Sequence, residues 1–121
     1  MTTQDNVPDF TIASHAAAGL ASRFTESRHL TATATACRGS RSASVSVFAV
    51  PLEDVQVIVD ERGLGEWDAD HRCVVWDWIT SETKMRLVMF DLSVEAVEIA
   101  TDADARAEAQ ALADVLDRGA A

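Results

Sequence analysis

The stretch LTATATACRGSRSASVSVFA, residues 30–49, changes between apolar and hydroxyl side chains at almost every position. A period of two is that of a β-strand, whose successive side chains point to opposite faces of the sheet. The Gly39-Ser40 pair near the middle suits a two-residue type II′ turn. These residues therefore predict a β-hairpin with an Ala/Val face toward the core and a Thr/Ser face toward solvent.

The register of this hairpin follows from the turn. With Gly39-Ser40 at the tip, Ala36 lies opposite Ala43, and a slip of one residue would turn every hydroxyl side chain into the core. Arg38 and Arg41 then face each other across the tip, which is mildly unfavourable for like charges. We expect a solvated tip, with a small cationic contact to an acidic surface as the alternative.

A second hairpin is predicted over residues 72–91, RCVVWDWITSETKMRLVMFD. With Ser81-Glu82 at the tip, two oppositely charged pairs fall in register, Asp77 with Arg86 and Arg72 with Asp91. The same register produces three apolar pairs: Trp78 with Met85, Trp76 with Leu87 and Val74 with Met89. Alternation favours this Trp/Met face as core, and an exposed face of this size would be a binding patch.

Helices are predicted at both ends of the chain. Alanines and Leu20 recur at helical spacing over residues 13–26. Near the carboxyl end, Thr101 and Asp104 have the spacing of a capping box for a last helix that ends at Gly119. Its predicted buried side consists of Ala105, Ala109, Leu112 and Leu116. Residues 94–100 fit either a short edge strand or another helical turn.

Residues 51–62 carry conflicting signals. Pro51, the acids Glu53 and Asp54, and Gly63 are typical of a helix start and stop, whereas a β-branched run from Val55 to Val59 favours a strand. We predict a strand over 54–60 and a loop over 61–70.

These elements predict an α+β fold: an antiparallel meander sheet of four to six strands, with an amino-terminal and a carboxy-terminal helix packed on it. The expected organisation is a disordered tail over 1–8, one domain over 9–118 and a short tail over 119–121.

Acidic charge is concentrated after Val50. Residues 1–50 hold three acids and four arginines, a net +1, and residues 51–121 hold seventeen acids and six bases, a net −11. Without a basic stripe to neutralise phosphates, direct nucleic-acid binding is disfavoured. The chain has neither a signal-peptide pattern nor an apolar run of about eighteen residues, so we expect a cytoplasmic protein with no membrane contact.

Neither the cysteines nor the histidines predict a metal or redox site. Cys37 and Cys73 form no CxxC motif, so two reduced thiols are expected, with a disulfide as the alternative. His71 and Cys73 would share a strand face but need two further ligands for a tetrahedral zinc site. We therefore predict no metal and no cofactor.

The densest polar cluster is EWDADH, residues 66–71. Acids around an exposed indole suit a basic partner, and an Asp beside a His can orient a general base. No nucleophile motif accompanies the cluster, so no catalytic residue is predicted. The residues predicted to bind a partner are Glu66, Trp67, Asp68, Asp70, Arg38 and Arg41.

The leading hypothesis is a non-catalytic protein-binding or assembly module, of a type that a phage or mobile element could encode. Its first rival is an acidic inhibitor that imitates nucleic acid or neutralises a basic toxin or nuclease. The second is a small enzyme that uses residues 66–71 with Asp77. A homodimer is also conceivable through an edge strand at 54–60 or 94–100.

Overall fold

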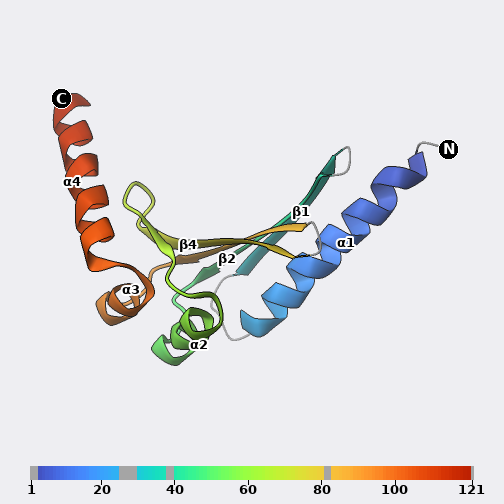
Figure 1. Ribbon diagram of the computed structural model, residues 1–121, viewed down its shortest axis with the longest axis horizontal. Coiled ribbons are helices and arrows are strands. Elements are labelled where there is room, and N and C mark those ends of the chain that lie inside the picture. The colour runs from blue at the N-terminus through green and yellow to red at the C-terminus, as the bar shows by residue number, and fades with distance from the viewer. Residues whose placement is uncertain (1–2, 25–29, 38–39, 81–82, 121) are drawn as a thin grey trace. The chain divides into compact units, whose positions relative to one another are not determined.

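The computed structural model describes the backbone of residues 3–24, 30–37, 40–80 and 83–120, and their side chains except at residues 3–9, 37, 40, 119 and 120. Over these residues the chain is an α+β fold, as predicted, with five strands and four α-helices (Figure 1). In chain order the elements are α1 (Thr3–Ala21), a 3₁₀ turn η1 (Ser22–Phe24), β1 (Leu30–Cys37), β2 (Ser40–Phe48), α2 (Leu52–Arg62), β3 (Glu66–Asp68), β4 (Cys73–Thr80), β5 (Thr83–Phe90), α3 (Val94–Ala100) and α4 (Ala103–Ala120).

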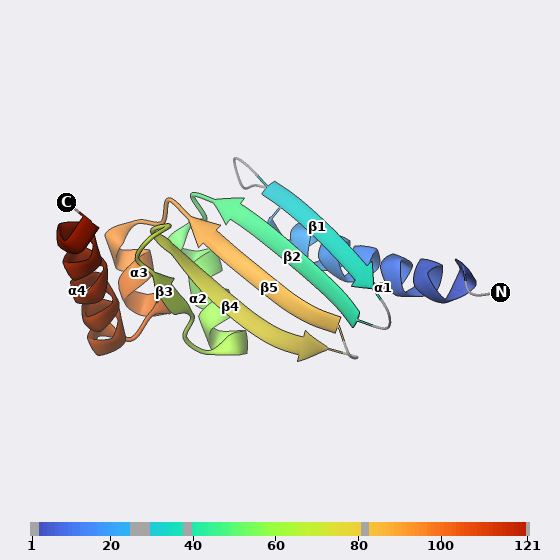
Figure 2. The same cartoon turned by 90° about the horizontal axis from the view of Figure 1, so that it is seen from above.

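The five strands form one sheet in the order β1-β2-β5-β4-β3, so the predicted meander is wrong. β1 and β3 run antiparallel to their neighbours β2 and β4, whereas β2 and β5 point the same way (Figure 2). Parallel neighbours cannot be joined by a tight turn and need a crossover connection. Here the chain leaves β2 through α2, β3 and β4 before it returns as β5.

The apolar face predicted for the first hairpin is buried on β2, at Ala43, Val45 and Val47. On β1 it is only half-buried or exposed, and the register of the hairpin differs from the prediction. Ala34 lies opposite Ala43 and Ala36 opposite Arg41, a shift of two residues from the prediction. Ser40, assigned to the turn, belongs to β2 and pairs with Cys37. A shift of two keeps the apolar residues on one face, so alternation alone does not exclude it. Because Arg41 lies opposite Ala36, the predicted pairing of Arg41 with Arg38 is wrong. Residues 38–39 lie outside the described part.

Residues 52–62 form helix α2, which corrects the predicted strand over 54–60. Pro51 precedes the first turn, and Gly63 ends the helix with φ +82°, a conformation that glycine adopts without strain. Val55 and Ile58, one turn apart, are buried. The start and stop signals prevail because each β-branched residue destabilises a helix by only about 0.5 kcal/mol relative to alanine.

Both end helices differ from their predicted limits, and α1 ends at Ala21 rather than at residue 26. Helix α1 begins at Thr3 rather than at residue 13, so it includes residues 3–8 of the stretch assigned to a disordered tail. It packs on β1 and β2. Helix α4 reaches Ala120, past the predicted end at Gly119. Its amino-terminal cap is Asp102, whose Oδ1 accepts from the backbone N–H groups of Asp104 and Ala105, and not the predicted Thr101.

Residues 94–100, which the sequence left open, are helical. The Ser93 hydroxyl accepts a hydrogen bond from the Ala96 N–H at 3.1 Å and caps α3. Since 54–60 and 94–100 are both helices, neither provides the edge strand that the dimer hypothesis invoked.

The chain divides into two compact units. Unit 1 comprises residues 1–48 and 77–88, and unit 2 comprises residues 49–76 and 89–121. The buried apolar side chains of unit 1 are Ala13, Ala17, Leu20, Phe24, Ala43, Val45, Val47, Met85 and Leu87. Those of unit 2 are Val50, Val55, Ile58, Cys73, Val74, Trp76, Met89, Ala96 and Ala100.

The residues around Gly65 are hydrogen-bonded and closely packed within unit 2. The Gly65 N–H donates to the Ala100 carbonyl at 2.7 Å, and the indole N–H of Trp76 donates to the Gly63 carbonyl at 3.0 Å. A Cβ at position 65 would lie 2.6 Å from Val74 Cγ1 and 2.8 Å from Trp76 Cε2. Trp76 is therefore core, as alternation predicts, whereas Trp78 in unit 1 is only half-buried.

The division also separates the charge. Unit 1 contains five acids and six bases, a net +1, and unit 2 contains fifteen acids and four bases, a net −11. The hairpin residues that join unit 1 from the later part of the chain carry two acids and two bases. The asymmetry of the sequence about Val50 is therefore an asymmetry between two folded units.

Candidate binding surfaces

The predicted cluster over residues 66–71 contains a short strand where a loop was expected. Glu66, Trp67 and Asp68 form β3, with Trp67 opposite Val74 and Asp68 opposite Cys73. Glu66 and Asp70 are exposed, and Asp68 is half-buried. Four of the six residues predicted to bind a partner thus lie together at one edge of unit 2.

Trp67 is not the exposed anchor that the sequence suggested. Its side chain is half-buried, and its indole nitrogen is shielded from solvent with no hydrogen-bond partner among the described residues. A ligand cannot reach a donor that water cannot reach, so only the ring of Trp67 is available for contact. No pattern in the sequence indicates that residue 67 pairs with β4.

Asp68 is tied to His71. His71 donates its backbone N–H to Asp68 Oδ1 at 3.1 Å, and its ring Nδ1 lies 2.9 Å from Asp68 Oδ2. Partial desolvation raises the pKa of Asp68, but the side-chain and backbone hydrogen bonds from His71 outweigh it and leave the pKa below its ordinary value. This contact orders the turn, and the pair is open to solvent.

Of the two arginines predicted as a cationic tip, the structure describes Arg41 alone. Arg41 is half-buried in β2 opposite Ala36, and Arg38 lies outside the described residues. The predicted cationic tip therefore stays a prediction.

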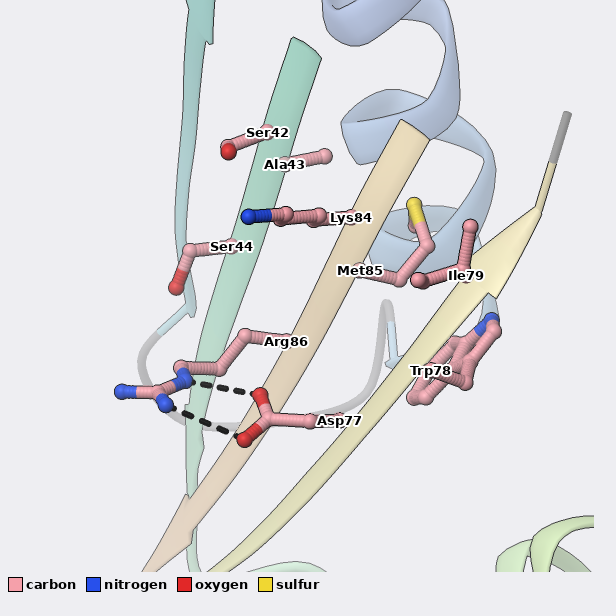
Figure 3. A pocket seen from close by; sticks show the side chains of 9 residues that line it. All are labelled: Ser42, Ala43, Ser44, Asp77, Trp78, Ile79, Lys84, Met85 and Arg86. Atoms are coloured by element: carbon pink, nitrogen blue, oxygen red, sulfur yellow. Dashed lines mark hydrogen bonds and ion pairs between the residues drawn. The ribbon is translucent and has the colours of Figure 1, made fainter. Parts of the chain in front are cut away.

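Asp77, the other carboxylate of the enzyme hypothesis, is held by an arginine in unit 1. Figure 3 shows Asp77 and Arg86 joined by two hydrogen bonds, Nε to Oδ1 at 2.8 Å and Nη2 to Oδ2 at 3.0 Å. This pair confirms the cross-strand contact predicted for the second hairpin. No ion pair joins the other predicted partners, Arg72 and Asp91, within the described part of unit 2.

A pocket of about 660 Å³ surrounds this pair in unit 1. Its lining residues are Ser42, Ala43, Ser44, Asp77, Trp78, Ile79, Lys84, Met85 and Arg86. In Figure 3 Lys84 and Arg86 extend to one side of the strands, and Trp78 and Met85 to the other. Because the charged and apolar groups do not converge on one point, the arrangement offers no evident reaction centre.

A pocket of about 370 Å³ lies in unit 2. It is lined by Trp67, Arg72, Val74, Met89, Asp91, Leu92, Val94, Val97, Glu98 and Arg106. Arg106 is positioned by a 2.7 Å hydrogen bond from Nη1 to the Thr101 hydroxyl. Glu66, Asp68, Asp70 and His71 line neither pocket, so neither provides the concave site that the enzyme hypothesis requires.

Helix α4 of unit 2 carries three exposed large apolar side chains. Leu112, Val115 and Leu116 are 61%, 60% and 61% exposed, and we call these three residues the α4 stripe. They recur at helical spacing and therefore share one side of the helix. The residues that α4 buries in part are Arg106, Ala109 and Ala113. Of the predicted buried side, Ala109 is half-buried, whereas Ala105, Leu112 and Leu116 are exposed and that part of the prediction is wrong. Helix α4 instead contacts β3 of unit 2.

Metal and membrane chemistry receive no support from the described residues. Among them no group of three or more His, Cys, Asp and Glu side chains converges to hold an ion. The Cys73 side chain is buried, and the Cys37 side chain is outside the described set. Within the same part of the chain, no helix combines the length and apolar character needed to cross a bilayer.

Comparisons of the chain with protein families, curated proteins and solved structures find no match.

Proposed function

We propose that this protein is a non-catalytic protein-binding module whose unit 2 presents helix α4 to a partner with an apolar groove and a basic rim. The α4 stripe is the observation that supports this function. Three large apolar side chains about 60% exposed on one side of a helix are typical of a helix that docks in a groove. Full burial of a Leu or Val contributes about 1.5–3 kcal/mol, so a covering partner gains on the order of 1–2 kcal/mol from each.

Charge around the stripe supports a basic partner. Asp104 and Glu108 are exposed and, at spacings of eleven and seven residues before Val115, follow the same row of the helix. The net −11 of unit 2 adds a long-range field that draws basic proteins toward it. The apolar stripe supplies affinity at contact and the acids supply steering.

A photo-crosslinking amino acid at position 112, introduced in the full chain and in the native host, tests this function. We expect one discrete crosslinked protein, whose contact region is apolar with Lys or Arg at its margin. The matched control places the same residue at Ala107, which is exposed on another side of α4. Equal crosslinking at both positions, or none at 112, would contradict the proposal.

The acidic inhibitor is a second candidate, supported by the concentration of fifteen acids in unit 2. It differs in its driving force, because a contact made mainly by exposed charges is screened away between about 50 mM and 500 mM salt. Leu112→Asp adds an acid and removes apolar area. It abolishes binding through the α4 stripe and leaves a purely acidic contact intact or strengthened, so this one variant separates the two candidates.

A further inference from the structure

We propose that two copies of this chain associate through the open edge of β1, which forms a continuous sheet across a two-fold axis. In the described sheet β1 is a terminal strand and pairs on one side only, with β2 (Figure 2). An eight-residue edge strand presents a row of unpaired backbone N–H and C=O groups. The segment that satisfies such a row of donors and acceptors is another β-strand. This inference concerns unit 1 and does not depend on α4.

The two edges of the sheet differ in how they are protected. Edge strand β3, in unit 2, is three residues long and carries Glu66 and Asp68. A helix contacts each edge strand, α4 for β3 and α1 for β1, so the two edges differ in strand length and charge, which are two of the usual means of blocking edge pairing. Edge strand β1 has the sequence LTATATAC, so it is eight residues long and contains neither a charged residue nor a proline. Of the two terminal strands, β1 is therefore the one whose length and sequence suit pairing with another strand.

Charge argues for a second copy as the occupant. Two copies of a chain with net charge −10 repel each other wherever their acidic units meet. Unit 1, with net charge +1, is the part through which they approach without that repulsion. Because β1 itself is uncharged, its approach to an identical strand brings no like charges together.

Side chains on β1 also fit self-pairing. A two-fold axis perpendicular to the sheet keeps each face on its own side and runs the two β1 strands antiparallel. Centred on Thr33, this pairing sets Thr33 opposite Thr33 of the second copy, and Thr31 opposite its Thr35. Threonines are favourable cross-strand partners, and all three are exposed. The apolar side of the new pair brings small alanines together, chiefly Ala32 and Ala34, which let the backbones approach.

Sedimentation velocity of the full chain over about 1–500 µM tests the proposal, since an interface built on one strand pair lies at the weak, micromolar end. We expect a concentration-dependent dimer. Replacing Thr31, Thr33 and Thr35 by lysine places like charges opposite each other and weakens the dimer at least about tenfold. The corresponding triple glutamate variant is expected to be equally weak. A mixture of the two variants is expected to form a heterodimer.

The matched control replaces Ser42, Ser44 and Ser46 by lysine, which puts the same charge on the same face of β2, one strand away from the edge. It is expected to dimerise as the unchanged chain does. Circular dichroism confirms that each variant is folded. A wild-type chain that stays monomeric over the whole range overturns the proposal, and so does a lysine/glutamate mixture that stays monomeric.

Discussion

Unit 1 and unit 2 bury cores of similar character and differ almost entirely at the surface. Unit 1 has a net charge of +1 and leaves a strand edge open, whereas unit 2 has a net charge of −11 and leaves a helix stripe open. The difference teaches that one short chain can separate two association chemistries. We propose backbone hydrogen bonding for the neutral unit, and charge steering with apolar contact for the acidic one.

The largest expected effect tests whether the two units are separate in stability. Leu87→Ala in unit 1 and Ile58→Ala in unit 2 each remove a side chain that is at most 2% exposed. Each is expected to lower the free energy of unfolding by about 2–5 kcal/mol in urea titrations. Hydrogen exchange should show the greater loss of protection in the unit that carries the change.

Val57→Ala is the control for this experiment, because Val57 neighbours Ile58 in α2 but is 46% exposed. It should cost less than about 1 kcal/mol. Uniform loss of protection across both units after either core substitution would break the comparison, and the chain would then be one cooperative body.

Replacing a glycine by alanine should change the stability in opposite directions in the two units. Gly65→Ala in unit 2 forces a Cβ within 2.8 Å of Val74 and Trp76 and is expected to destabilise by about 1–3 kcal/mol. Gly19→Ala in α1 of unit 1 meets nothing within 4 Å and should stabilise by about 0.5–1 kcal/mol. Thermal unfolding of both variants measures the difference, and the same sign for both would refute the close packing at Gly65.

A smaller effect is expected from the Asp77–Arg86 pair of unit 1. Both side chains are exposed, so a double-mutant cycle to alanine should yield a coupling of about 0.2–1 kcal/mol despite the two hydrogen bonds. Repeating the cycle in about 1 M salt should reduce the coupling. A coupling that is unchanged by salt would show that the pair is shielded from solvent.

The smallest effect is the pH response of Asp68 in unit 2. Because the folded pKa of Asp68 lies below its ordinary value, its contribution to stability is present above about pH 3.9 and is lost as the pH falls through the folded pKa. Carboxyl NMR titration of His71→Ala should show the Asp68 pKa returning toward its ordinary value. A pKa that stays low in that variant would assign the shift to another neighbour.

Local patterns in the sequence predicted both hairpins and the two end helices, but not α2 or β3, and they predicted strand pairing only in part. Alternation identified the buried face of β2, and opposite charges located Asp77 against Arg86. The register of the first hairpin was wrong by two residues, since burial repeats every two residues and does not distinguish those registers. Strand order was wrong because α2 turns an expected tight connection into a crossover.

The candidate site was less predictable than the fold. Alternation cannot show that Trp67 pairs within a short strand and loses its exposed nitrogen. The apolar side of α4 was recognised, but a periodic pattern states only that a face is apolar and not that the chain supplies a cover for it. Leu112 and Leu116 thus have the expected spacing and the opposite exposure.

The second hairpin has a consequence for how this protein can be cut or inherited. Unit 1 needs residues 77–88 and unit 2 needs residues 49–76 and 89–121, so each unit is interrupted by the other along the chain. No truncation from either end removes one unit and leaves the other whole. The gene therefore cannot gain or lose either whole unit as one contiguous segment, and isolating a unit requires a permuted or relinked chain.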